Sequence, residues 1–320
     1  MATTSQGMDS RGLGWLPDVP SIRDYTEEHP EVAPLLEQTR LQPRIGGRSA
    51  PSTSGGSARG RGGVTAVATA AAAAPALLPA VDLRAHCPPI EDQGSLGSCT
   101  ANAAVALIEY FERRASGKHI DASRLFVYKV TRDILGWTGD TGTYLRTTMG
   151  ALVLFGAPPE RYWPYDGTPS AINVHYDVEP TSFCFAFGAD FKAIKYYRLD
   201  GPGVTGPSLL AAIRQYVAAG LPSMFGFPVY PEYDSPLPGG LIPFPSPTSP
   251  LRGGHANVVV GYDDNKMIGA DKGALLVRNS WGTGWGDAGY GWMSYRYVTE
   301  ALATDFWSVI KASWVQTGNF

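Results

Sequence analysis

A single cysteine at a glycine-rich turn, directly before a helix-like run, constrains this chain most. Cys99 closes the stretch Gln-Gly-Ser-Leu-Gly-Ser-Cys, residues 93–99. Residues 98–114 contain no Gly or Pro and end in charges, which predicts a buried helix that emerges at its C-terminal end. A helix N-terminus carries roughly half a positive charge and favours an anion there. The pattern predicts a thiol held at the start of a buried helix.

Other residues match the groups that a thiol nucleophile needs. Only the thiolate attacks a carbonyl, so the thiol requires an activating base. His255 leads into the β-like run 256–262, and Asn279 follows the apolar run 274–277, so they are the candidate base and the group that orients it. Gln93 can donate its side-chain amide to an oxyanion beside the backbone N–H of Cys99.

Each of these residues also has a purely structural interpretation. A buried cysteine usually acts as a small hydrophobic residue. His255 would then be a core histidine whose ring nitrogens form structural hydrogen bonds, and Asn279 would be a turn residue. The glycine turn with its glutamine and the strand-like flanks of His255 and Asn279 favour the catalytic interpretation.

These motifs resemble those of the papain family of cysteine peptidases. The similarity covers about residues 81–310 and runs through Val81-Asp82-Leu83-Arg84, Gln93, Cys99, His255, Asn279-Ser280-Trp281-Gly282, Trp285-Gly286 and Gly289-Tyr290. Leu96 and Thr100 stand where the family has a cysteine and a tryptophan, so the family's disulfide from that position cannot form. A microbial branch of this family, the xylellain-type proteases, is the most similar in three places. These are the sequence around Cys99, the Pro-rich stretch before His255, and Asp305-Phe306-Trp307 near the C-terminal end.

The resemblance implies an α+β fold of two lobes, one helical and one an antiparallel β-barrel-like lobe, with an N-terminal extension. It implies a cysteine peptidase, taken as an endopeptidase, that works through a thioester and needs no cofactor or metal. It also suggests Gly142 as a main-chain binder of extended peptide, Trp281 on the leaving-group side, and Asp305 near the closed end of the main specificity pocket.

Composition divides the chain into three parts. Residues 1–42 form an N-terminal segment with an apolar anchor at Trp15, Leu16 and Tyr25. Residues 43–79 are rich in Gly, Ser, Ala and Pro and have the composition of a flexible linker. Residues 80–320 form the expected peptidase domain.

Within that domain, residues 81–180 are predicted to be mainly helical and residues 181–310 mainly strands. Predicted helices, in addition to the one beginning at Cys99, are 122–135, 143–155 and 207–219, with a short one near 31–40. Predicted strands are 190–198, 223–229, 256–262, 274–279 and 289–295. Residues 228–250 hold eight prolines, which predicts an ordered loop without regular structure beside the cleft.

The N-terminal segment has three interpretations: an inhibitory propeptide lying in the cleft, a structural strap, or an inert tail. It is too short and too poor in charged helix for the family's usual helical prodomain. Its apolar anchor and the linker favour inhibition, since a tethered segment has a high effective concentration near the cleft.

Charge and cysteine content limit the partners. The chain has 26 Lys and Arg against 29 Asp and Glu, a net charge of −3, so neither nucleic acid nor an anionic membrane is indicated. Cys87 and Cys184 can pair or remain two free buried thiols. The sparse cysteines and the absence of a signal-like N-terminus or membrane span favour the cytoplasm. The expected partners are a peptide or protein substrate and the N-terminal segment itself, in a monomer.

Two other function classes share these motifs. One is a catalytically inactive papain-like fold used for binding or assembly, although such a module has no need of an intact catalytic set. The other is acyl transfer to an amine through the same thioester.

Overall fold

The computed structural model describes residues 11–41, 77–165, 175–188 and 194–320. The helices are α1 (Ala33–Leu36), η1 (Arg84–His86), α2 (Cys99–Ser116), α3 (Arg124–Leu135), α4 (Leu145–Phe155), η2 (Glu160–Tyr162), α6 (Ser182–Phe187), α7 (Gly206–Ala218), α8 (Pro231–Asp234), α9 (Arg296–Thr299) and α10 (Ala312–Val315). The strands are β1 (Ala80–Asp82), β2 (Lys195–Arg198), β3 (Ser223–Val229), β4 (Leu241–Ile242), β5 (Gly253–Ile268), β6 (Asp271–Arg278), β7 (Tyr290–Ser294) and β8 (Thr304–Ile310).

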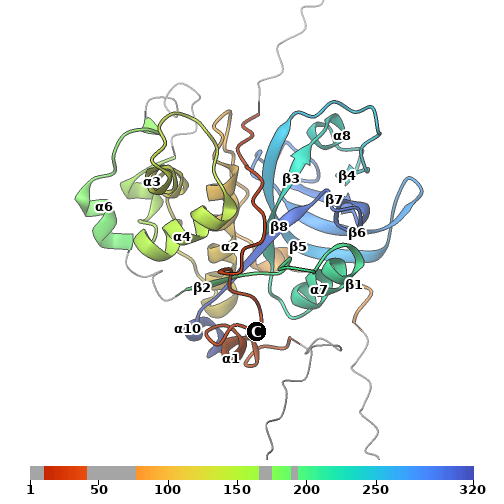
Figure 1. Cartoon of the computed structure of the whole chain (residues 1–320), viewed down its shortest axis with the longest axis horizontal. Coiled ribbons are helices and arrows are strands. Elements are labelled where there is room, and N and C mark those ends of the chain that lie inside the picture. The colour runs from red at the N-terminus through yellow and green to blue at the C-terminus, as the bar shows by residue number, and fades with distance from the viewer. Residues whose placement is uncertain (1–10, 42–76, 166–174, 189–193) are drawn as a thin grey trace, which may run out of the picture.

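Helix α2 runs through the middle of the molecule and contacts both lobes (Figure 1). It packs against α3 and α4 on one side and against β5 on the other. Its run of Ala, Val, Leu and Ile is buried, and the helix ends where Gly117 adopts a left-handed conformation at φ 76°. The predicted buried helix beginning at Cys99 is therefore present.

The β lobe is one sheet with strand order β2-β8-β3-β5-β6-β7-β4, and β1 pairs with β5 outside this path. All of these pairs are antiparallel except β4 with β7. Strand β3 is almost wholly buried, as are residues 255–262 of β5 and 273–278 of β6. The fold is thus α+β, with a helical lobe beside a mostly antiparallel β lobe, as the sequence predicted.

Several details differ from the predicted elements. Helix α6 lies in the region expected to form strands, and its Phe183 and Phe185 pack on Tyr162 and Phe126 of the helical side. The chain therefore crosses to the β lobe only after α6. Strand β8 was not predicted, and the Pro-rich stretch before His255 contains α8 and β4 rather than loop alone.

Residues 11–41 lie along the junction of the two lobes (Figure 1). The segment ends in α1, where Val32 and Leu36 are buried. Most of the predicted linker, residues 43–76, falls outside the described residues. No helix in the described ranges has both the length and the apolar character needed to cross a membrane.

Candidate functional site

Three separate elements bring the predicted catalytic residues together at the lobe junction. Cys99 is the first residue of α2, and His255 lies near the start of β5. Strands β5 and β6 are antiparallel with Val258 opposite Arg278. Because side chains alternate along a strand, this register brings Asn279, just after β6, beside the face that carries His255.

The imidazole of His255 is held by one hydrogen bond. Its Nε2 lies 2.8 Å from Oδ1 of Asn279, and the indole of Trp281 covers the imidazole with ring centroids 4.7 Å apart. Nδ1 of His255 has no hydrogen-bond partner among the described residues. The ring is therefore oriented through one nitrogen, and the other remains available for proton transfer.

Gln93 is fixed by hydrogen bonds at both ends of its amide. The hydroxyl of Ser280 donates to its Oε1 at 2.6 Å, and its Nε2 donates to the carbonyls of Leu96 at 2.9 Å and Gly12 at 3.1 Å. Because the hydroxyl of Ser280 binds Oε1 of Gln93, the amide nitrogen Nε2 faces the cleft. There it holds a carbonyl oxygen of the N-terminal segment.

Residues 11–16, here called the cleft segment, fill the space between the lobes. Trp15 forms a parallel bridge with Thr143 on the helical side. The backbone bonds run from Gly12 N to Gly94 O (3.0 Å), Thr143 N to Gly14 O (2.7 Å), Trp15 N to Gly254 O (3.1 Å) and Leu16 N to Thr143 O (3.1 Å). The cleft segment thus bonds to both walls, as an extended peptide would.

Two glycines let the cleft segment approach this closely. A Cβ built at Gly14 would lie 1.8 Å from the carbonyl oxygen of Gly97, and one at Gly12 would lie 2.0 Å from that of Leu96. Both contacts are with backbone, which cannot move aside as a flexible side chain can. Alanine at either position is therefore incompatible with the docked segment.

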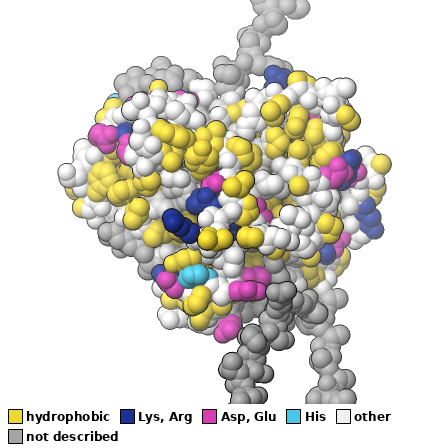
Figure 2. Space-filling view, in the orientation of Figure 1, with side chains coloured by type: hydrophobic (Ala, Val, Ile, Leu, Met, Phe, Trp, Pro, Cys, Tyr) yellow, Lys and Arg dark blue, Asp and Glu magenta, His cyan; other side chains and the backbone are white. Residues whose placement is uncertain are grey.

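The docked segment buries the site completely. Cys99, His255 and Gln93 have no exposed surface, so none of them contributes to the molecular surface drawn in Figure 2. Burial raises the pKa of the Cys99 thiol to about 11, an effect that backbone amides including those of Gly14 and Trp15 reduce. Burial lowers the pKa of His255 to about 4, although the hydrogen bond that the ring donates to Asn279 raises it. Both groups are therefore neutral near pH 7.

The residues suggested as substrate contacts all border the cleft segment. Gly142 lies against it, since a Cβ there would be 2.2 Å from Gly14 O. However, the backbone bonds come from the next residue, Thr143, because the N–H of Gly142 donates to the Tyr128 hydroxyl. The carbonyl of Trp281 accepts from Arg11 at 3.2 Å.

Asp305 lies at the closed end of the pocket that holds the Trp15 side chain. The indole Nε1 donates to Oδ2 of Asp305 at 3.0 Å. The carboxylate is wholly buried, and its backbone has a positive φ of 61°. Burial raises its pKa to about 6, which the ion pair with Arg198 and the two indole hydrogen bonds reduce.

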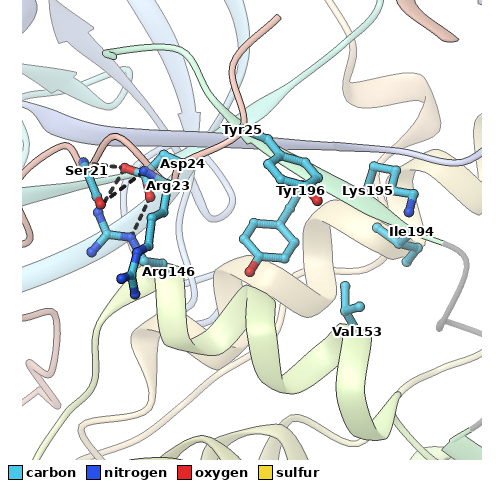
Figure 3. A pocket seen from close by; sticks show the side chains of 9 residues that line it. All are labelled: Ser21, Arg23, Asp24, Tyr25, Arg146, Val153, Ile194, Lys195 and Tyr196. Carbon is cyan, nitrogen blue, oxygen red and sulfur yellow. Dashed lines mark hydrogen bonds and ion pairs between the residues drawn. The ribbon is translucent and has the colours of Figure 1, made fainter. Parts of the chain in front are cut away.

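A second anchor holds the N-terminal segment on the side of α4 and β2. Arg146 of α4 makes two hydrogen bonds to Asp24, at 2.8 and 2.9 Å, and also pairs with Asp18. These contacts border a cavity of about 550 Å³ between the segment and the two elements (Figure 3). The segment is thus fixed outside the cleft as well as within it.

Sequence reasoning missed several residues of the site. No role is predicted for Ser280, which appears only within the Asn-Ser-Trp-Gly motif. Nothing in the sequence singles out Thr143, which binds the cleft segment, or Gly226, which lies against the Trp15 indole. A signal for Ser280 did exist, since a hydroxyl next to the predicted orienting Asn279 can reach a neighbouring amide. Cys87 and Cys184, left open as a pair or as free thiols, are free and buried.

Known proteins resemble this chain over most of its length. A family model described as "Papain family cysteine protease" matches residues 78–310. An uncharacterised peptidase C1-like protein of Acanthamoeba polyphaga mimivirus is 32% identical over 235 residues, 72% of each chain. A cathepsin B-like protein of Giardia intestinalis is 30% identical over 221 residues, 64% of each chain.

A solved structure agrees with these sequences. Xylellain, a cysteine protease from Xylella fastidiosa, superposes with a TM-score of 0.67 at 30% identity, covering 97% of this chain and 99% of that one. The family match spans both lobes and includes the cysteine, histidine and asparagine described above. The chain belongs to the papain family of cysteine proteases.

Proposed function

We propose that residues 80–320 are a peptidase domain in which Cys99, His255 and Asn279 hydrolyse peptide bonds, and that residues 1–42 hold it latent. The observation that carries the proposal is the cleft segment itself. Its backbone pairs with both walls, and its Gly12 carbonyl accepts from Gln93. A site that holds an extended chain beside a thiol, an imidazole and an amide donor has the parts for acyl transfer.

His255 would transfer the protons in both halves of the reaction. The imidazole takes the Cys99 proton, and the thiolate attacks the scissile carbonyl carbon. The N–H groups of Gln93 and Cys99 stabilise the oxyanion. The imidazolium then protonates the departing amine, leaving a thioester. Water, deprotonated by the same imidazole, attacks the thioester and releases the acid and the free thiol.

Latency follows from what the cleft segment presents to the sulfur. Backbone amides of Gly14 and Trp15 partly offset the rise in the pKa of the Cys99 thiol, so the segment presents N–H groups to the sulfur, whereas a substrate must present a carbonyl carbon. The carbonyl that Gln93 holds belongs to Gly12, two residues away from Gly14. The segment therefore occupies the site and blocks the approach of a substrate.

The test compares full-length chains on a fluorogenic peptide library. Gly12→Ala/Gly14→Ala, here called the displaced variant, should hydrolyse peptides at least about tenfold faster than the unmodified chain, because its segment cannot dock. Adding Cys99→Ala should leave only the small residual rate due to binding and the oxyanion hole. Gly150→Ala is the matched control, since its added Cβ would meet only Tyr196 Oη, at 3.8 Å.

Other cysteines provide the second control. Cys87→Ser and Cys184→Ser in the displaced variant should keep kcat largely intact. Undiminished hydrolysis after Cys99→Ala would refute the nucleophile. Equal rates in the displaced variant and the unmodified chain, with both folded by circular dichroism, would refute latency alone.

A further inference from the structure

The side chain of Trp15 occupies a pocket in the β lobe that is shaped to an indole. Only 6% of Trp15 is exposed. A Cβ built at Gly226 of β3 would lie 1.9 Å from the indole Cε2. One at Gly254 would lie 2.1 Å from the backbone carbonyl oxygen of Trp15 and 2.9 Å from its Cε3, so glycine there admits both the backbone and the ring. Neither glycine has a positive φ, so the backbone there accepts any residue. The two glycines therefore leave room for a flat bicyclic ring.

The pocket ends in a single hydrogen-bond acceptor. Oδ2 of Asp305 accepts from the indole N–H of Trp15, while Oδ1 accepts from the indole of Trp307 at 2.7 Å. The backbone N–H groups of Asp305 and Phe306 donate to Asp200. The acceptor is thus held in place by the body of the enzyme and does not depend on the segment.

The charges around this acceptor balance once the segment has left. Arg198 pairs with Asp305 at 3.1 Å and with Asp200 at 2.9 Å, and Arg146 lies nearby over the Trp307 ring. The remaining acids of the cluster, Asp18 and Asp24, belong to the segment. The body alone keeps two carboxylates and two guanidiniums, so the pocket offers an acceptor without a net negative charge.

From this geometry we propose that the pocket selects a tryptophan side chain in the peptide substrate. The inference rests on the proposed function and names its substrate class. An indole fills the flat space and donates its N–H to Asp305. A phenyl or aliphatic side chain leaves the buried acceptor without a donor. Lysine or arginine would bring a cation beside Arg198, where no unpaired carboxylate compensates it.

The test uses the full-length displaced variant and a positional library in which each acyl-side position is varied in turn. Tryptophan should be preferred at one position over phenylalanine, leucine and arginine, by about tenfold to a hundredfold in kcat/KM. A matched peptide with 3-benzothienylalanine, which has the same shape without the N–H, should lose most of that advantage.

Gly226→Ala in the displaced variant provides the structural arm. The three atoms nearest to the added Cβ all belong to Trp15, so the methyl occupies the space that the indole fills. It should remove the preference for tryptophan while peptides with alanine or valine at that position are still cleaved. Gly150→Ala should change neither.

The outcomes separate the two proposals. If the displaced variant cleaves no peptide, the proposed function fails, and this inference fails with it. If it cleaves peptides but prefers leucine, phenylalanine or arginine, the inference alone is overturned and the pocket serves only the segment. Equal rates for the tryptophan and benzothienyl peptides would likewise overturn the role of Asp305.

Discussion

At the residue scale, burial holds both groups of the proposed dyad neutral. The Cys99 thiol keeps its proton because its pKa is raised to about 11, and His255 stays uncharged because its pKa is lowered to about 4. Between these values the closed site contains a thiol and an imidazole rather than a thiolate and an imidazolium. Displacing the segment admits water, which reduces the cost of charging both groups.

This predicts different pH profiles for alkylation of Cys99 by iodoacetamide. In the unmodified chain the rate should stay low at neutral pH and rise only as pH approaches about 11, because the reactive thiolate forms there. In the displaced variant the thiolate should form beside the imidazolium, so labelling at pH 6 should be at least about a hundredfold faster. Mass spectrometry of the peptide containing Cys99 measures both rates, and coincident profiles would contradict the account.

The sequence allowed a prediction of site residues where the chemistry demands a specific side chain, and their catalytic roles stay a prediction. Gln93, Cys99, His255 and Asn279 could be named from spacing and from their neighbours, and the structure brings all four to one junction. The pairing of Trp15 with Asp305 could not be named, because the two residues are 290 positions apart and meet only once both lobes have formed.

At the scale of elements, the sequence predicted the strands that are rich in apolar and β-branched residues, but it did not predict strand β8. β3, β5, β6 and β7 correspond to apolar runs bounded by turn signals. The second residue of β8 is Asp305, a charged residue with a positive φ, and neither property is typical of a strand. Its charge is accommodated by Arg198 in the neighbouring strand β2, a contact that no local pattern reveals.

Element packing also predicts the effect of loosening the second anchor. Arg146→Gln in the otherwise unmodified chain removes the ion pairs from α4 to Asp18 and Asp24, and Asp24 is almost fully buried. Basal peptide hydrolysis should rise by about tenfold, as expected for loss of a partly buried charged pair. Arg161→Gln is the control, because Arg161 is exposed and contacts Tyr162. Unchanged hydrolysis in Arg146→Gln would show that the anchor does not hold the segment.

At the scale of the whole molecule, the N-terminal segment is part of the packed structure. It contributes Trp15, Val32 and Leu36 to the core and bonds to both lobes. The two-lobe architecture followed from the motifs and from the order of the helical and strand-like regions. The path of the segment did not, because only an apolar anchor signalled that it docks, and the cleft it occupies forms from residues far along the chain.

Cys99 is, in this proposal, a nucleophile closed off by the chain's own N-terminus. The most direct measurement is intact-mass and peptide-mapping analysis after incubation with an epoxysuccinyl peptide, a reagent that alkylates the active-site thiol of cysteine peptidases. The account predicts a single adduct on Cys99 in the displaced variant and little or none in the unmodified chain over the same time. Adducts on Cys87 or Cys184, or equal labelling of Cys99 in both chains, would contradict it.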